Sequence, residues 1–113
     1  LALGGGEVLE GLTQFLGHVG EWKFDGLKLG LFLVHAGQVD EAIQRLNVYI
    51  QENPDSDEAY YLLGNAWRKK GDNRQALNNY LEAIHRNPDS PAKNAYDMLM
   101  DILDFYYKEM YNQ

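Results

Sequence analysis

The 113-residue sequence contains no cysteine, and this absence excludes several kinds of site. Without thiols the chain has no disulfide framework, no thiolate nucleophile and no sulfur ligand for a metal. Chains without disulfides are typical of reducing compartments, so we predict a cytoplasmic location.

Positive charge is also scarce, since 10 Lys and Arg residues are outnumbered by 17 Asp and Glu, which gives a net charge of −7. Nucleic-acid backbones are bound by clustered Lys and Arg, so we expect no nucleic-acid partner. The same deficit disfavours an anionic membrane surface. The most apolar stretch, residues 27–36, contains Lys28 and is too short to span a bilayer. No basic segment precedes an apolar stretch at the start, so we expect no signal peptide.

Motifs for catalysis and metal binding are missing too. His18, His35 and His85 are not spaced as metal ligands on a helix, and no second ligand accompanies any of them. The glycines at 4–6 lack the Lys and Ser/Thr of a phosphate loop, and the acidic stretch at 53–58 lacks the ligand spacing of a calcium loop. We therefore predict a non-enzymatic protein without a cofactor.

What the sequence does contain is a repeat of 34 residues. Aligning residues 23–56 with 57–90 gives nine identities, concentrated at small residues and turn residues. Self-similarity at this period is typical of stacked helical hairpins. The identities are Leu29 with Leu63, Gly30 with Gly64, Gly37 with Gly71, Ala42 with Ala76, Ile50 with Ile84, and the two NPDS runs that end the repeats.

Each repeat divides into two helical segments. Apolar residues follow one helical face in the second half of each repeat. We predict that Gly37 and Gly71 end the first helix of each pair, because a positive φ is favoured there. Pro54 and Pro88 mark the end of the second helix. The apolar faces are Val39, Ala42, Ile43, Leu46, Tyr49 and Ile50 in the first repeat, and Ala76, Leu77, Tyr80, Leu81, Ala83 and Ile84 in the second.

Gly64 lies inside a predicted helix, where glycine costs about 1 kcal/mol relative to alanine. Gly30 repeats this feature one period earlier. We predict that both glycines let the two helices of a pair approach closely. The larger side chains expected around the Gly64 notch are Tyr60, Leu63, Trp67 and Tyr80.

The second repeat resembles the tetratricopeptide repeat family. Residues 57–90 carry that family's pattern at Tyr60, Leu63, Gly64, Trp67, Ala76, Tyr80, Ala83 and Pro88. Residues 23–56 match more loosely, with Gly26 where the first aromatic belongs and Tyr49 in place of a small residue. The C-terminal half is similar to small bacterial tetratricopeptide proteins of unassigned role. The resemblance implies an all-α fold, a right-handed helical-repeat solenoid of antiparallel helix pairs with two full repeats and flanking helices.

We predict one domain over residues 1–113, with flanking segments on both sides of the repeats at 23–56 and 57–90. Residues 1–22 have apolar positions at helical spacing, so we predict a helix there. Because the segment is rich in glycine, a frayed arm or a leader is the alternative. Residues 91–111 are predicted to form a capping helix, with Ser90 as its N-cap and Pro91 in its first turn.

The resemblance also implies a function, because in this family the first helices of the repeats line a concave groove that holds a peptide or partner helix. We therefore predict a protein–protein interaction adaptor whose partner is an unidentified protein or peptide. An apolar segment with a nearby carboxylate would suit this surface, but Arg68 and Lys69 could equally be an ordinary solvated face. By register, the groove residues are Leu27, Leu31, Tyr61, Asn65, Arg68 and Lys69, with Phe24, Lys28, Val34, His35 and Glu58 on the same surface.

Two further expectations concern partners. Some family members clamp the acidic tail of heat-shock chaperones, but the corresponding positions here are Leu27, Leu31, Leu62, Ala92 and Tyr96, so we expect no such carboxylate clamp. The alternative to an adaptor is a homodimer formed through the C-terminal helix, which is more apolar than a cap requires. The residues predicted for self-association are Tyr96, Tyr106, Tyr107, Met110 and Tyr111, although these could also pack on the second repeat or lie singly on the surface.

Overall fold

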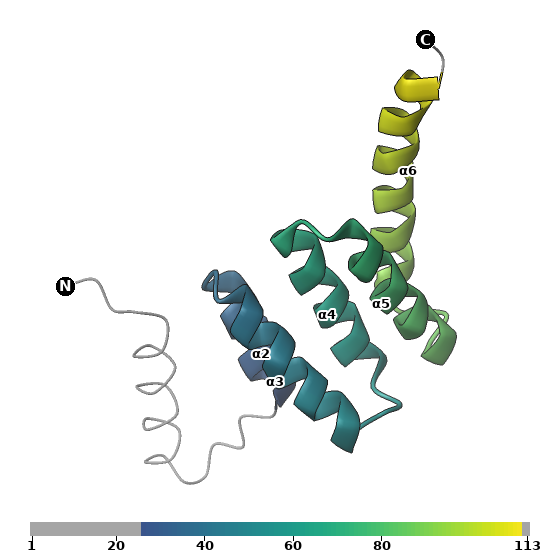
Figure 1. Ribbon diagram of the computed structural model, residues 1–113. Helices are drawn as coiled ribbons and strands as arrows, with labels where there is room; N and C mark the ends of the chain where they lie inside the picture. Colours follow the sequence, from purple (N-terminus) through teal and green to yellow (C-terminus); the bar gives the residue numbers. More distant parts are fainter. Residues whose placement is uncertain (1–25, 112–113) are drawn as a thin grey trace, which may run out of the picture.

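The computed structural model describes residues 26–111, with side chains up to residue 106. Within this range the chain is entirely helical, and no strand occurs. Two antiparallel helix pairs lie side by side, and a last helix packs on the second pair (Figure 1). The predicted all-α helical-repeat fold is confirmed, while the segment 1–22 lies outside the described residues. The helices are α2 (Gly26–His35), α3 (Val39–Glu52), α4 (Asp57–Lys70), α5 (Asn73–Arg86) and α6 (Ala92–Tyr111).

Each helix pair is a hairpin that turns at a glycine. Gly37 and Gly71 have φ values of 82° and 99°, a region that side chains with a Cβ rarely adopt. In the second hairpin, the amide of Asp72 donates to the carbonyl of Trp67 at 2.9 Å. The amide of Gln38 makes the equivalent bond in the first hairpin, also at 2.9 Å. Both first helices therefore end as predicted, with the bonding of a left-handed glycine cap.

Polar side chains begin three of the helices. The Ser56 hydroxyl accepts from the amide of Ala59 at 3.3 Å at the start of α4. The Asp72 carboxylate accepts from the amide of Gln75 at 3.0 Å at the start of α5. Before α6, the buried Ser90 hydroxyl accepts a bond of 3.1 Å from the amide of Ala92. These bonds satisfy amides that have no partner inside the helix, and they fix where each helix begins.

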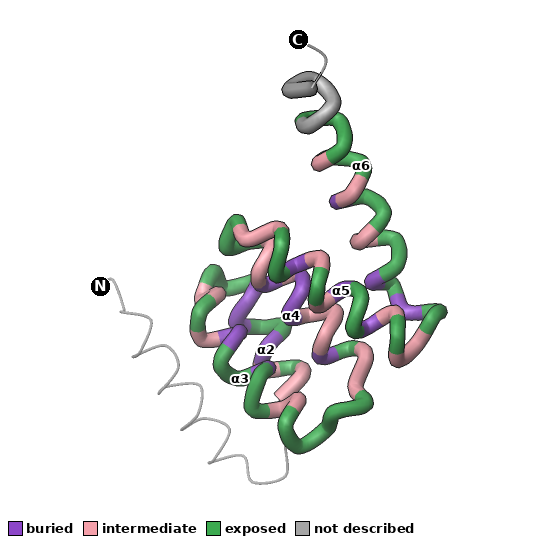
Figure 2. Tube along the Cα trace, turned by 45° about the vertical axis from the view of Figure 1, so that its right-hand side comes forward, coloured by how far each residue is buried: buried purple, intermediate pink, exposed green. Residues whose placement is uncertain are grey.

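The core consists of two clusters joined by Trp67. The half-buried indole of Trp67, on α4, packs against both clusters. Buried residues therefore run continuously from the first helix pair to α6 (Figure 2). Stacking of this kind buries faces that a single hairpin would leave exposed. The first cluster is Leu33, Val34, Ala42, Ile43, Leu46, Leu63 and Ala66, and the second is Ala76, Tyr80, Ala83, Ala92 and Leu99.

The helices of each pair approach closely at the predicted glycines. A Cβ atom on Gly30 would lie 2.6 Å from Cδ2 of Leu46, and one on Gly64 would overlap the Tyr80 ring. A third close approach occurs at Gly26, where a Cβ atom would lie 2.8 Å from Cδ2 of Tyr49. In the first pair, the small residue Gly26 is thus on α2 and the large residue Tyr49 is on α3. At the equivalent positions of the second pair, the large residue Tyr60 is on α4 and the small residue Ala83 is on α5. Gly26 and Tyr49 each depart from the family pattern, and the two departures compensate each other.

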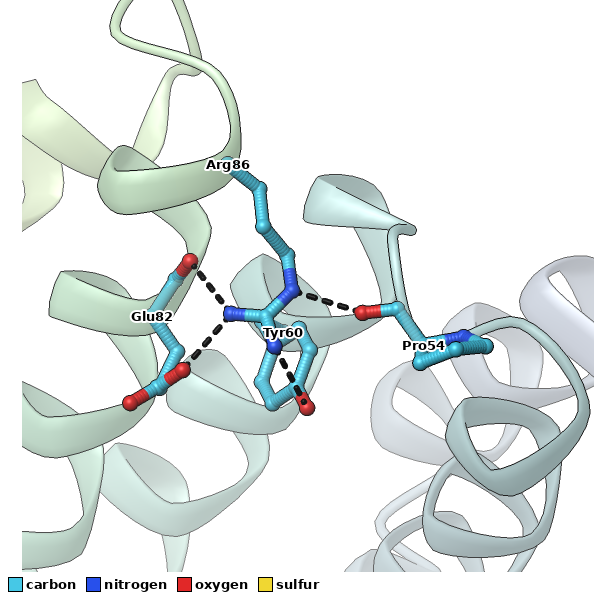
Figure 3. Close-up of polar contacts among 4 residues, drawn as sticks. All are labelled: Pro54, Tyr60, Glu82 and Arg86. Carbon is cyan, nitrogen blue, oxygen red and sulfur yellow. Dashed lines mark hydrogen bonds and ion pairs between the residues drawn. The ribbon is translucent and has the colours of Figure 1, made fainter.

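One polar cluster ties the second repeat to the turn that ends the first repeat (Figure 3). The guanidinium of Arg86 donates from Nε to the carbonyl of Pro54 at 2.6 Å and from Nη2 to the Tyr60 hydroxyl at 3.2 Å. Its Nη1 donates to the Glu82 carboxylate at 2.6 Å, and its Cζ lies 4.1 Å from the centre of the Tyr60 ring. A planar guanidinium suits this role because its donors point in several fixed directions.

Candidate functional site

A hollow of about 470 Å³ lies between the first helices of the repeats. Its walls come from α2, from the N-terminal half of α4 and from the connection between α5 and α6. Apolar side chains form most of the exposed lining, and polar and charged residues form the rest, which is the usual make-up of a ligand-binding cleft. The lining residues are Leu27, Lys28, Leu31, Asp57, Glu58, Tyr61, Leu62, Asn87 and Pro91.

The lining follows the register of the repeat. Leu27 and Tyr61 are equivalent positions 34 residues apart, as are Lys28 and Leu62. Asp57 and Pro91 form a third such pair. The hollow is therefore part of the surface that the first helices of successive repeats share. Of the six predicted groove residues, Leu27, Leu31 and Tyr61 are brought together in it.

The other three predicted groove residues do not line the hollow, and each contacts a neighbouring element. Asn65 accepts a hydrogen bond of 2.6 Å from the Tyr80 hydroxyl through its Oδ1. Lys69 donates from Nζ to the carbonyl of Val34 at 2.9 Å, which joins α4 to the last turn of α2. Arg68 lies near Tyr80: burial raises the pKa of the Tyr80 hydroxyl, and the hydrogen bond and charge of Arg68 partly offset this.

The charged groups of the hollow are mainly acidic. Asp57 and Glu58 stand in the first turn of α4, where the helix dipole stabilises negative charge. The Asp57 carboxylate accepts a hydrogen bond of 3.2 Å from the side-chain amide of Asn87. Among the described lining residues, Lys28 is the one basic side chain. The polar groups of the hollow are therefore not the basic surface expected from Arg68 and Lys69.

Sequence reasoning did not place Asp57, Leu62, Asn87 and Pro91 in this surface. Leu62 was within reach of the repeat itself, because it is one period after Lys28, and Pro91 is one period after Asp57, which was also missed. Asn87 belongs to the second NPDS run, which the sequence identifies only as a turn. Its contact with Asp57 depends on how two turns meet in space, and helical periodicity carries no signal for that.

The described part of the chain has neither a metal-binding cluster nor a membrane-spanning helix. No group of three or more His, Cys, Asp or Glu side chains suited to a metal ion occurs among these residues. None of the helices described between residues 26 and 111 combines the length and the apolar character needed to cross a membrane.

The residues predicted for self-association differ in their surroundings. Tyr96 is half-buried and packs against the second core cluster, whereas Tyr106 is 64% exposed. The side chains of Tyr107, Met110 and Tyr111 lie outside the described ones. Three further apolar side chains among the described residues of α6 are exposed as well, namely Met98, Ile102 and Phe105.

Comparison with known proteins agrees with this architecture. A family profile described as Tetratricopeptide repeat matches residues 33–99. The solution NMR structure of the Bacteroides fragilis protein BF1650 superposes with a TM-score of 0.71 at 54% identity, over 80% of this chain and 92% of that one.

Two curated proteins match shorter stretches. Cellulose synthase operon protein C of Escherichia coli K12 is 32% identical over 73 residues, and tetratricopeptide repeat protein 37 of Xenopus laevis is 30% identical over 71 residues. These matches cover 65% and 63% of this chain but only 6% and 4% of the two relatives. They therefore concern the repeats and not the whole relatives.

Proposed function

Because the chain belongs to the tetratricopeptide repeat family, we propose that it is a non-enzymatic adaptor that binds a segment of another protein in the hollow between α2 and α4. Repeats of this family generally mediate protein–protein interactions, and the family is generally non-enzymatic. The observation that carries the proposal is the meeting of Leu27, Leu31 and Tyr61 in one hollow on the shared face of the first helices.

The hollow supports binding through apolar contact first. Leu31 is 43% exposed, and Leu27 and Tyr61 are partly exposed beside it. One large apolar side chain of a partner, fully buried there, would contribute about 1.5–3 kcal/mol. A few such contacts at the centre of an interface usually carry most of its affinity. The partner segment is therefore expected to present apolar side chains to this surface.

The match to cellulose synthase operon protein C does not extend the proposal to a pathway. The aligned stretch spans 6% of that protein. It supports the repeat fold, and the role named for that protein is not proposed for this chain.

Paired baits test the proposal. Wild type, Leu31→Glu and Val48→Glu are used to capture partners from source-cell lysate, with helix content checked by circular dichroism. Leu31 lines the hollow, whereas Val48 on α3 is 57% exposed and outside it, so both variants place one charge on an exposed apolar position. A partner retained by wild type and by Val48→Glu but lost with Leu31→Glu supports the proposal. A partner that binds all three baits equally contradicts it.

Self-association through the C-terminal helix stays a prediction. Among the predicted residues, the side chains of Tyr96 and Tyr106 are described. Tyr106 is exposed, whereas Tyr96 packs against the core. Light scattering over a range of concentrations tests it directly. A mass that stays that of a single chain at high micromolar concentration would exclude a homodimer of ordinary affinity.

A further inference from the structure

The last helix departs from the repeat at the two positions that make a hairpin. Met98 stands one period after Gly64, where the first two repeats have the glycine that admits the second helix. Phe105 stands one period after Gly71, where the first two repeats turn. With phenylalanine in place of the turn glycine, the helix continues to Tyr111. The residues themselves therefore prevent α6 from forming a third hairpin of the same kind.

The face of α6 that a second helix would cover is exposed and apolar. Met98, Ile102 and Phe105 are 55%, 39% and 63% exposed and follow one another at helical spacing. Tyr106 extends this row, with its ring edge-on to Phe105 at 5.9 Å between centres. The C-terminal end of α6 extends beyond the other described helices (Figure 1). A contiguous apolar surface of this kind marks an interaction site more often than single exposed residues do.

A row of carboxylates runs beside the apolar row. Asp97, Asp101 and Asp104 are exposed, and each immediately precedes a member of the apolar row. By helical register, Lys108 follows these three carboxylates at the C-terminal end of the same stripe. Since consecutive residues are about 100° apart around a helix, the two rows lie next to each other along its length. On its other side, the apolar row borders the face that packs against the second core cluster through Ala95, Leu99 and Leu103. The open surface is thus apolar with one acidic edge.

We propose that this surface binds an amphipathic helix of a partner protein, with Lys or Arg along the edge that faces the three aspartates. The helix would lie on α6 roughly as α5 lies on α4, with its apolar side chains on Met98, Ile102 and Phe105. The acidic row selects the charge of the partner, and the net charge of −7 of the whole chain favours encounter with a basic one. This site is separate from the hollow between α2 and α4, so the adaptor would have two binding surfaces.

An antiparallel second copy of the chain fits this surface poorly. In an antiparallel pair of α6 helices related by a two-fold axis, the two aspartate rows lie along the same edge of the interface. Like charges placed opposite one another disfavour such a contact, and each copy brings the same negative net charge. A basic helix replaces this repulsion with attraction.

Designed peptides provide the test. Two amphipathic peptides of about 18 residues, five helical turns, share one apolar face and carry Lys or Glu on the flanking edge. Their binding to the full chain is measured by fluorescence anisotropy at low and moderate salt. We expect the Lys peptide to bind about tenfold or more tightly than the Glu peptide, with a difference that shrinks as salt is added. Equal binding, or no binding of the Lys peptide, would overturn the proposal.

Variants locate the site and separate it from the hollow. Ile102→Glu should abolish binding of the Lys peptide, whereas Leu31→Glu and Val48→Glu should leave it unchanged. The triple variant Asp97→Lys, Asp101→Lys, Asp104→Lys should prefer the Glu peptide. If Leu31→Glu removes binding while Ile102→Glu does not, the peptide occupies the hollow and the assignment to α6 is wrong. Light scattering measures the molar mass of the wild type and of Ile102→Glu. A molar mass of two chains for the wild type and of one chain for Ile102→Glu would assign the surface to a second copy and also overturn the proposal.

Discussion

The ring of Tyr80 fills the space that a side chain at Gly64 would occupy. An added Cβ would overlap ring atoms Cδ1 and Cε1, and Tyr80 itself is fully buried. The glycine on α4 and the aromatic ring on α5 therefore form one packing unit, in which the helix propensity lost at Gly64 is offset by closer contact between the helices.

This relationship predicts that Gly64→Ala destabilises the fold although alanine is the better helix former. Overpacking against a rigid buried ring costs about 1–3 kcal/mol. Gly30→Ala is the matched variant, because its Cβ would meet Cδ2, Cγ and Cδ1 of Leu46, an aliphatic side chain that can change rotamer more readily than a tyrosine ring. Urea denaturation should show the larger loss for Gly64→Ala. A loss at Gly30 equal to or larger than that at Gly64 would contradict the packing argument.

The buried hydroxyl of Tyr80 predicts that the free energy of unfolding falls at alkaline pH. Burial raises its pKa above the ordinary value of 10.0, so above that pH the unfolded state releases a proton that the folded state retains. The contribution of the protonated Tyr80 hydroxyl to the free energy of unfolding is complete below about pH 10. It is lost as pH rises through the raised pKa. Tyr80→Phe lacks this proton and also lacks the bond to Asn65, which contributes about 1 kcal/mol at neutral pH.

Denaturation curves of both proteins between neutral pH and pH 11 test this directly. The difference in free energy of unfolding should favour wild type at pH 7 and shrink above about pH 10. Because the other tyrosines are common to both proteins, they largely cancel in the difference. A difference that stays constant with pH would show that Tyr80 titrates as a free tyrosine.

Arg86 is predicted to stabilise the junction between the repeats. Arg86→Ala removes donors to Pro54, Tyr60 and Glu82 and should lower the free energy of unfolding by about 1–3 kcal/mol. Arg86→Lys should recover little of it, because one ammonium group cannot reach all three acceptors with the same geometry. Arg74→Ala, on the exposed side of the same helix, is the control and should have almost no effect. Similar losses for both alanine variants would contradict this role.

Lys69 and Lys70 are adjacent but should differ in their effect on stability. The bond from Lys69 to the carbonyl of Val34 is partly buried. Lys70 pairs with Asp40 at 2.6 Å in an exposed position, and its Nζ lies 5.5 Å from the centre of the Trp67 ring. Replacing each by Met keeps the aliphatic stem. Lys69→Met should cost about 1 kcal/mol and Lys70→Met no more than about 0.5 kcal/mol. If thermal denaturation reverses this order, the contact from Lys69 to α2 does not stabilise the helix pair.

The repeat made most of this fold predictable. Gly37 and Gly71 mark the two turns, and the close approaches at Gly30 and Gly64 follow from glycine recurring inside a helix. The compensating packing of Gly26 against Tyr49 was harder to predict from the sequence. Each residue taken alone departs from the family pattern, and only their contact in space shows that the two departures compensate.

The candidate site was predictable only in part. Helical register places Leu27, Leu31 and Tyr61 on one face, and the structure brings these residues together. Register also places Lys69 on the predicted groove, but a long flexible side chain can reach back to another helix, as it does to Val34. A prediction based on Cα positions therefore works for short apolar side chains and is weak for lysine.

The most direct measurement is site-specific photocross-linking from the hollow. A photoreactive amino acid replaces Leu31 in one protein and Val48 in another, and both are irradiated with the partner captured by the wild-type bait. The account predicts a covalent adduct from position 31 and none from position 48. Adducts from both positions, or from position 48 alone, would contradict binding in the hollow between α2 and α4.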